Sequence, residues 1–168
     1  MNNYHDKNPE HLSLVGPKFC GKSVLLHAFY KMMKQEEFSS SYITVLWNLS
    51  RHTPVDNNDF LLQMCKKIGS ALQPHNDELA QILLTSKGEP YEALKVVIED
   101  LEEKGSKTLM IWDGFDKPLT SGKLTRNLWD NMRFLAENKS FRLITATRLK
   151  LTELISDDKS RTSDFWTI

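Results

Sequence analysis

A short motif near the N-terminus carries the residue types that hold a phosphate group. It reads G-x-x-x-x-G-K-S and comprises Gly16, Pro17, Lys18, Phe19, Cys20, Gly21, Lys22 and Ser23. In this pattern backbone N–H groups cradle phosphates, the lysine reaches the β- and γ-phosphates, and the hydroxyl binds Mg²⁺. We therefore predict that these eight residues and the following Val24 bind a nucleotide. Lys22 would also act in catalysis, and Ser23 would be a ligand of the metal.

The residues on either side of this motif predict the strand and the helix that such a loop requires. Residues 12–15 form a short apolar run suited to a buried strand, and an apolar stretch over 24–33 begins a helix that reaches about Gln35. A helix that starts at a glycine-rich turn leaves its first N–H groups without partners, and its dipole favours an anion there. The context therefore agrees with the motif.

A second motif supplies carboxylates. The run Leu109-Met110-Ile111-Trp112-Asp113-Gly114-Phe115-Asp116 begins as a buried strand and ends in acidic residues. Hydrolysis needs a carboxylate near Mg²⁺, held by a rigid strand that faces the phosphate-binding loop, and Asp113 is placed for this role. It also needs a group that orients the attacking water. Gly114 has no side chain for that task, so we assign it to Asp116.

The D-G-hydrophobic-D order resembles the STAND class of P-loop NTPases, which are signalling relatives of AAA+ ATPases and include NACHT and NB-ARC proteins. The stretch over 143–148, which ends in Arg148, is similar to the fourth strand of that class. The resemblance implies water activation by Asp116 and a γ-phosphate sensor role for Arg148. It covers the chain from Leu12 to Arg148. Lys117 departs from it, because the class often has a second acidic residue there, and this favours weakened hydrolysis.

The class continues with a fifth core strand and a helical lid that carries further nucleotide contacts. The sequence supplies neither after Ile168. We therefore expect residues 1–168 to be a single P-loop NTPase domain, the N-terminal piece of a larger multidomain protein, with residues 1–10 as a lead-in segment.

Strands and helices alternate along the chain. The patterns predict strands over 42–49, 108–112 and 141–147, helices over 60–72, 79–83, 91–101, 124–135 and 149–155, and connections over 36–41 and 114–121. This order predicts an α/β fold, a three-layer α/β/α sandwich with a mainly parallel sheet that lacks the last core strand and lid. Ligands of such sheets bind at the carboxyl ends of the strands, where the first motif, Asp113 and Arg148 all fall.

Composition narrows the functional classes. Lys plus Arg equal Asp plus Glu at 22 each, so no basic field indicates nucleic-acid binding. No apolar run is long enough for a membrane span, and residues 1–10 have no secretory character. Cys20 and Cys65 form neither a metal-binding pattern nor a disulfide framework, which is typical of a cytoplasmic protein.

These observations predict a Mg²⁺-dependent, ATP-binding and ATP-hydrolysing module that acts as a nucleotide-controlled switch. ATP is favoured over GTP because no N-K-x-D sequence is present. Its partners would be other domains of the same protein or neighbouring protomers. A module that binds nucleotide without hydrolysing it is the main alternative. A small-molecule kinase is a further one, although no arginine-rich lid supports it.

Overall fold

The computed structural model describes residues 11–86 and 88–154, together with Ser163 and Phe165. Its elements are β1 (Leu12–Val15), α1 (Lys22–Met33), α2 (Glu36–Ser39), β2 (Tyr42–Asn48), α3 (Asn57–Leu72), α4 (Asp77–Leu84), α5 (Pro90–Glu103), β3 (Lys107–Asp113), α6 (Asp116–Thr120), α7 (Arg126–Glu137), β4 (Phe141–Thr147) and α8 (Leu151–Leu154). The lead-in segment predicted over 1–10 lies outside the described residues, as does most of the segment after α8.

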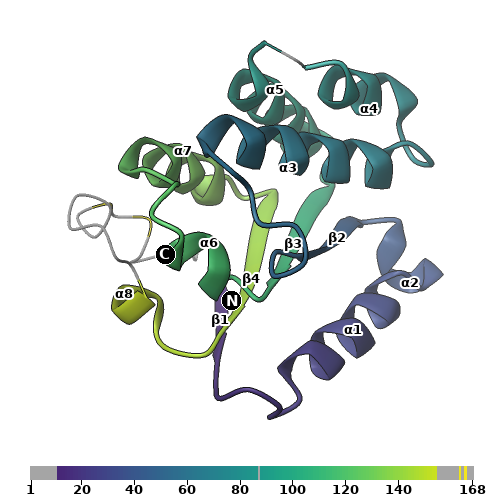
Figure 1. Ribbon diagram of the computed structural model, residues 1–168. Helices are drawn as coiled ribbons and strands as arrows, with labels where there is room; N and C mark the ends of the chain where they lie inside the picture. The colour runs from purple at the N-terminus through teal and green to yellow at the C-terminus, as the bar shows by residue number, and fades with distance from the viewer. Residues whose placement is uncertain (1–10, 87, 155–162, 164, 166–168) are drawn as a thin grey trace, which may run out of the picture.

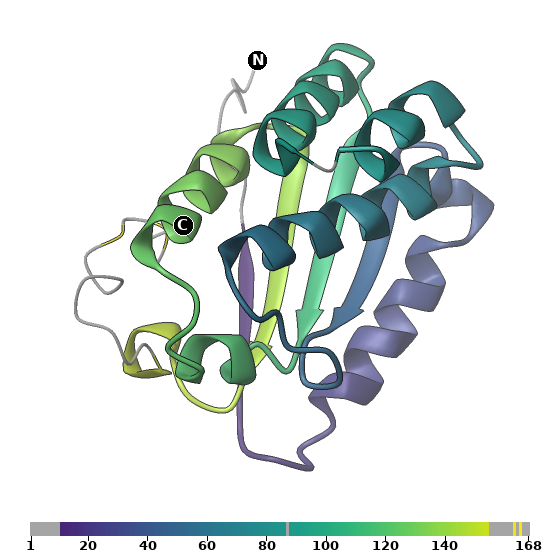
Figure 2. The same cartoon turned by 45° about the horizontal axis from the view of Figure 1, so that its top comes forward.

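The strands form one parallel sheet in the order β1-β4-β3-β2. Helix α1 covers one face, while α3, α5 and α7 cover the other (Figures 1 and 2). Each face of the sheet has its own apolar cluster, because successive side chains of a strand point to opposite faces. On β3, Leu109 and Ile111 pack on the α1 side, whereas Met110 and Trp112 pack on the other side. The predicted three-layer α/β fold with a parallel sheet is confirmed.

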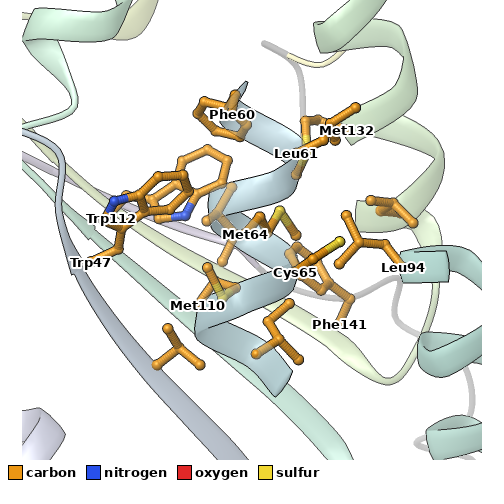
Figure 3. Packing of buried hydrophobic residues seen from close by; sticks show 14 of the residues in the cluster. Trp47, Phe60, Leu61, Met64, Cys65, Leu94, Met110, Trp112, Met132 and Phe141 are labelled. Atoms are coloured by element: carbon orange, nitrogen blue, oxygen red, sulfur yellow. The ribbon is translucent and has the colours of Figure 1, made fainter. Parts of the chain in front are cut away.

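Aromatic side chains fill the larger cluster and connect the sheet to the functional edge. The Phe60 ring of α3 lies 5.0 Å from the ring of Trp47 on β2 and 5.3 Å from that of Trp112 on β3 (Figure 3). Trp112 in turn lies 4.8 Å from Phe115, and all four side chains are almost fully buried. Close-packed rings leave little freedom for the backbone that carries them. The backbone from Asp113 to the start of α6 is therefore fixed between two buried rings, that of Trp112 before it and that of Phe115 at its end.

Two short helices lie where the sequence predicts connections, and that prediction is wrong. In α6, Pro118 occupies the first turn, where a helical N–H has no partner in any case, so the proline does not oppose the helix. Burial of Pro118 and Leu119 then stabilises this turn. In α2, Glu36 and Glu37 lie in the first turn, where the helix dipole favours negative charge.

Strand β1 is less buried than the sequence predicts. Leu12 is 53% exposed and Val15 is 48% exposed, because within the described chain β1 pairs only with β4 and has a second, open edge. An apolar run of four residues does not reveal whether a strand is central or at an edge.

His11 fixes the start of β1 through both nitrogens of its ring. The N–H of Leu143 donates to His11 Nδ1 at 3.1 Å, so the ring hydrogen is on Nε2, which donates to the carbonyl of Ala136 at 3.0 Å. Burial lowers the pKa of His11 below its ordinary value of 6.5; the hydrogen bond to Ala136 acts against this, and the charge of Arg142 adds to it. The neutral ring is therefore the form that anchors β1.

We expect the free energy of unfolding to fall in acid partly through this residue. Its folded-state pKa is lower than its unfolded value, so its contribution is complete above about pH 6.5 and is lost as the pH falls through the folded pKa. Urea unfolding at about pH 7.5 and about pH 5 should show a smaller pH dependence for His11→Gln than for the wild type. The exposed His75 provides the control variant, His75→Gln. Equal pH dependence in all three proteins would contradict this assignment.

Candidate nucleotide site

A cleft of about 650 Å³ opens at the carboxyl edge of the sheet. Its walls come from the phosphate-binding loop after β1, the end of β2, the segment after β3, and the end of β4. The sheet topology accounts for this convergence, since the carboxyl ends of parallel strands share one edge.

The loop between β1 and α1 has the backbone conformation that its motif predicts. Gly21 has φ of 91°, and the φ of 65° at Phe19 is unusual for an aromatic residue. Gly21 is also the residue before the first turn of α1. Because glycine has no side chain, it cannot accept hydrogen bonds from the N–H groups of that turn. The Lys22 ammonium bonds the carbonyls of Gly16 at 2.5 Å and Pro17 at 2.8 Å, which holds it over its own loop.

Ser23 and Asp113 are 90 residues apart in sequence and meet in the cleft. The Ser23 hydroxyl donates to Asp113 Oδ1 at 3.1 Å, and the Asp113 side chain is 5% exposed. A hydroxyl and a carboxylate side by side are oxygen donors of the kind that Mg²⁺ prefers when nucleotide phosphates and water complete its coordination. Among the described residues no cluster of three or more His, Cys, Asp or Glu side chains exists that could enclose a metal alone. The donor set therefore fits a metal that arrives with a phosphate ligand.

Asp116 and Arg148 form an ion pair at the same edge. Asp116 Oδ1 accepts from the backbone N–H of Arg148 at 2.8 Å and from its Nε at 3.3 Å. The Asp116 side chain is 9% exposed, whereas the Arg148 side chain is 46% exposed. Because Asp116 begins α6 and Arg148 follows β4, this pair connects two elements that border the cleft. Both residues line it.

The structure brings most of the predicted site residues together. Lys18, Phe19, Gly21, Lys22, Ser23, Val24, Asp113, Asp116 and Arg148 all line the cleft. Gly16, Pro17 and Cys20 belong to the loop but do not line it; the Gly16 N–H instead donates to the carbonyl of Thr147 at 3.1 Å and joins the loop to β4.

Five lining residues lie outside the predicted site, namely Asn48, Ser50, Gly114, Lys117 and Ala146. Asn48 ends β2, and its side chain accepts from the N–H and the hydroxyl of Ser50 at 3.1 and 2.7 Å. The Lys117 ammonium donates to the carbonyl of Ser50 at 3.0 Å. The position of Asn48 at the carboxyl end of a predicted parallel strand is a signal that could have identified it. Lys117 is thus a contact between α6 and the loop after β2.

Gly114 cannot be replaced without strain. Its φ is 70°, and a Cβ atom added there would lie 2.8 Å from the Cβ of Ser50. Gly105 has a similar φ of 69° but no atom near an added Cβ, so Gly105→Ala measures the backbone cost alone. We expect Gly114→Ala to lower the free energy of unfolding by roughly 1–3 kcal/mol more than Gly105→Ala in urea titrations. Equal losses would show that the loop after β2 moves aside freely.

Solved structures place this architecture among known folds. Neither a protein-family model nor a curated protein matches the sequence. The chain is similar to the ORC2 protein of Aeropyrum pernix in ADPNP–ADP complexes, with a TM-score of 0.59, 12% identity, and coverage of 93% of this chain and 38% of that one.

Two further structures agree with the first. The ORC1 protein of Aeropyrum pernix in complex with DNA has a TM-score of 0.56 at 16% identity, and covers 94% of this chain and 38% of that one. Cdc6p from Pyrobaculum aerophilum has a TM-score of 0.55 at 13% identity, with coverage of 91% of this chain and 37% of that one. The chain thus spans less than two fifths of the length of these proteins. The likeness shows the fold: the chain shares the α/β architecture of part of each of these proteins.

Proposed function

We propose that this chain is a Mg²⁺-dependent module that binds and hydrolyses ATP and serves as a nucleotide-controlled switch in a larger regulatory or signalling protein. The observation that carries the proposal is the 3.1 Å hydrogen bond between Ser23 and Asp113, which joins the two motifs across 90 residues. Lys22, Asp116 and Arg148 line the same cleft. The shared fold with AAA+ ATPases supports the nucleotide-binding part of the proposal.

The residues divide into binding and catalytic roles. The N–H groups at the start of α1 and the Lys22 ammonium would hold the β- and γ-phosphates. Ser23 would be a ligand of Mg²⁺ and Asp113 would hold its position; the metal, when bound, offsets the negative charge of the phosphates. Asp116 would accept a hydrogen bond from the attacking water and orient it toward the γ-phosphorus atom.

The Arg148 guanidinium has two possible partners at this site, the Asp116 carboxylate and a γ-phosphate. The guanidinium contacts Asp116 in the structure described here. A γ-phosphate in the cleft would compete for that guanidinium, because phosphate oxygens are strong acceptors for arginine. Movement of the guanidinium would leave Asp116 Oδ1 with its hydrogen bond to the Arg148 backbone N–H alone, and it would alter the contact between α6 and the end of β4. Ordering of such segments by a γ-phosphate is a known way for nucleotide state to reach other domains.

The finer assignments depend on the motifs. The D-G-F-D sequence at residues 113–116 supports placement in the STAND class within the AAA+ relatives. We propose that the partners are neighbouring protomers or other domains of the same protein and that the protein is cytoplasmic. Within the described residues no helix is long and apolar enough to span a membrane.

Binding without hydrolysis is the principal rival function. Gly114 stands where a catalytic glutamate follows the strand in many P-loop ATPases, and Lys117 occupies a position that is often acidic in the STAND class. The ion pair with Arg148 also engages Asp116. These features predict slow turnover, and phosphate-release measurements will separate slow hydrolysis from none.

Calorimetric titration of the purified chain with ATP and with GTP, each with and without Mg²⁺, tests the proposal. We expect saturable binding of ATP that is tighter than that of GTP and that weakens when Mg²⁺ is removed. Absence of nucleotide binding would refute the proposal for this chain. Transfer of the γ-phosphate to a small acceptor rather than to water would instead identify a kinase.

A further inference from the structure

The edge of the sheet opposite β1 lies in a second cleft. Strand β2 is the last strand of the sheet on this side, and α1 and α3 flank it on the two faces (Figure 2). A cleft of about 410 Å³ follows the strand between the two helices. It shares no lining residue with the nucleotide cleft.

The backbone of β2 offers hydrogen-bonding groups to this cleft. The carbonyl of Ser41 and the N–H of Leu49 bond β3, which sets the alternation along the strand. In a parallel ladder the intervening residues of even number direct their N–H and carbonyl groups away from β3. Thr44 and Leu46 belong to this set and line the cleft. Within the described chain no strand pairs with this side of β2. Leu46 is half-buried, so an added strand can reach its backbone groups, whereas Thr44 is 1% exposed and can be reached only when the flanking side chains move aside.

Three lysines surround this open edge. Lys34 follows the last residue of α1, and Lys66 and Lys67 come from α3. Among the described residues no acidic side chain lines the cleft. None of the three has an ion-pair partner among the described residues. Burial lowers the pKa of Lys67, whose ammonium lies 5.7 Å from the centre of the Trp47 ring. A partly desolvated ammonium has less water to lose when it meets an anion.

A buried hydroxyl in the same cleft also lacks a partner. The Thr44 side chain is 1% exposed, and its Oγ1 makes no hydrogen bond with any described residue. Buried polar side chains are rarely left unpaired. Trp47 Nε1, Thr108 Oγ1 and Trp112 Nε1 in the core are unpaired as well, so the lysines and the unpaired side of β2, rather than this hydroxyl, indicate a binding surface.

We propose that an acidic segment of a partner protein binds in extended conformation along β2, as an additional strand between α1 and α3. Main-chain hydrogen bonds to Thr44 and Leu46 would set its register, and its carboxylates would face the lysines. A second copy of this chain is disfavoured as the occupant, because edge-to-edge pairing would bring like-charged lysines together. A strand edge without a paired neighbour matches a peptide backbone better than a sugar–phosphate backbone, because it offers backbone N–H and carbonyl groups in alternation.

The test uses the whole chain and the peptide fluoresceinyl-Val-Glu-Glu-Val-Glu-Glu-Val-amide, which carries the dye on its N-terminal amine, followed by fluorescence anisotropy. We expect saturable binding with a Kd below about 1 mM. The charge-reversed variant Lys34→Glu/Lys66→Glu should weaken it at least about tenfold. Lys95→Glu/Lys123→Glu, which changes the net charge equally at exposed positions outside the cleft, should bind within about twofold of the wild type.

A second peptide distinguishes strand addition from simple charge attraction. The same sequence with N-methyl groups on alternate residues keeps its carboxylates but loses backbone donors, and its affinity should fall at least about tenfold. Equal binding of the methylated peptide, or equal losses in the two double variants, would overturn the proposal. So would a single-stranded oligonucleotide of about 20 nucleotides that binds through Lys34 and Lys66 while the peptide does not. Nucleotide binding is measured separately, so its failure leaves this test unaffected.

Discussion

Replacing Lys22 with alanine is expected to weaken ATP binding at least about 100-fold, because the loop loses the ammonium group that its motif directs at the β- and γ-phosphates. The ammonium already lies beside the loop, bonded to the carbonyls of Gly16 and Pro17. Those two carbonyls remain accessible to solvent in the variant, so the thermal midpoint should change by only a few degrees. Calorimetry with ATP and Mg²⁺ measures the first effect, and thermal unfolding measures the second.

The matched control is Lys31→Ala, which removes an exposed lysine from the same helix outside both clefts. It should bind ATP as the wild type does. Lys22→Arg keeps the charge but changes its shape, and should bind with intermediate affinity. If Lys22→Ala bound ATP normally, the phosphates would not lie in this loop, and the proposed site would be wrong.

Asp116→Asn is expected to reduce the rate of ATP hydrolysis about 100-fold while the affinity for ATP stays within about threefold of the wild type. The amide keeps an oxygen that can accept from the Arg148 N–H, now at 2.8 Å, so the fold of this edge is retained. It loses the negative charge that would polarise the attacking water. Single-turnover measurements of phosphate release give the chemical rate directly.

Asp130→Asn serves as the control for loss of an acidic partner. Asp130 pairs with Arg126 at 3.2 Å on α7, and neither residue lines the nucleotide cleft. The Asp130→Asn variant should hydrolyse ATP at the rate of the wild type. An unchanged rate in Asp116→Asn would assign water orientation to another group, and a joint loss of binding and hydrolysis would make Asp116 a positioning residue for Arg148.

The sequence predicts that the two motifs lie near each other, because two rules act together there. A buried apolar run that ends in Asp113 and a glycine-rich turn before α1 both specify strand ends, and the parallel topology collects strand ends at one edge. The meeting of Ser23 and Asp113 follows from these rules, although neither residue is near the other in sequence. Once the fold class is known, local sequence patterns therefore predict which side chains meet at the carboxyl edge of the sheet.

Other features depend on contacts that no local pattern records. The ion pair between Asp116 and Arg148 requires the lengths of two loops to match, and the bond from Lys117 to Ser50 depends on the path of the chain after β2. Helix α6 forms in a segment whose D-K-P sequence also suits a turn, because burial of Leu119 outweighs that local preference. The exposure of β1 depends on the order of strands, which periodicity does not specify.

The position of β1 has a consequence for the folding pathway. Its residues come first in the chain, yet they pair with β4, where Leu12 lies opposite Ile144 and the hydrogen bond from Thr145 to Ser13 spans 132 residues. Contacts that close such long loops carry a large entropic cost and tend to form late. During synthesis, β2 and β3 with the helices between them can assemble before β4 has left the ribosome. The phosphate-binding loop would then be ordered last, and nucleotide would bind only chains that have finished folding.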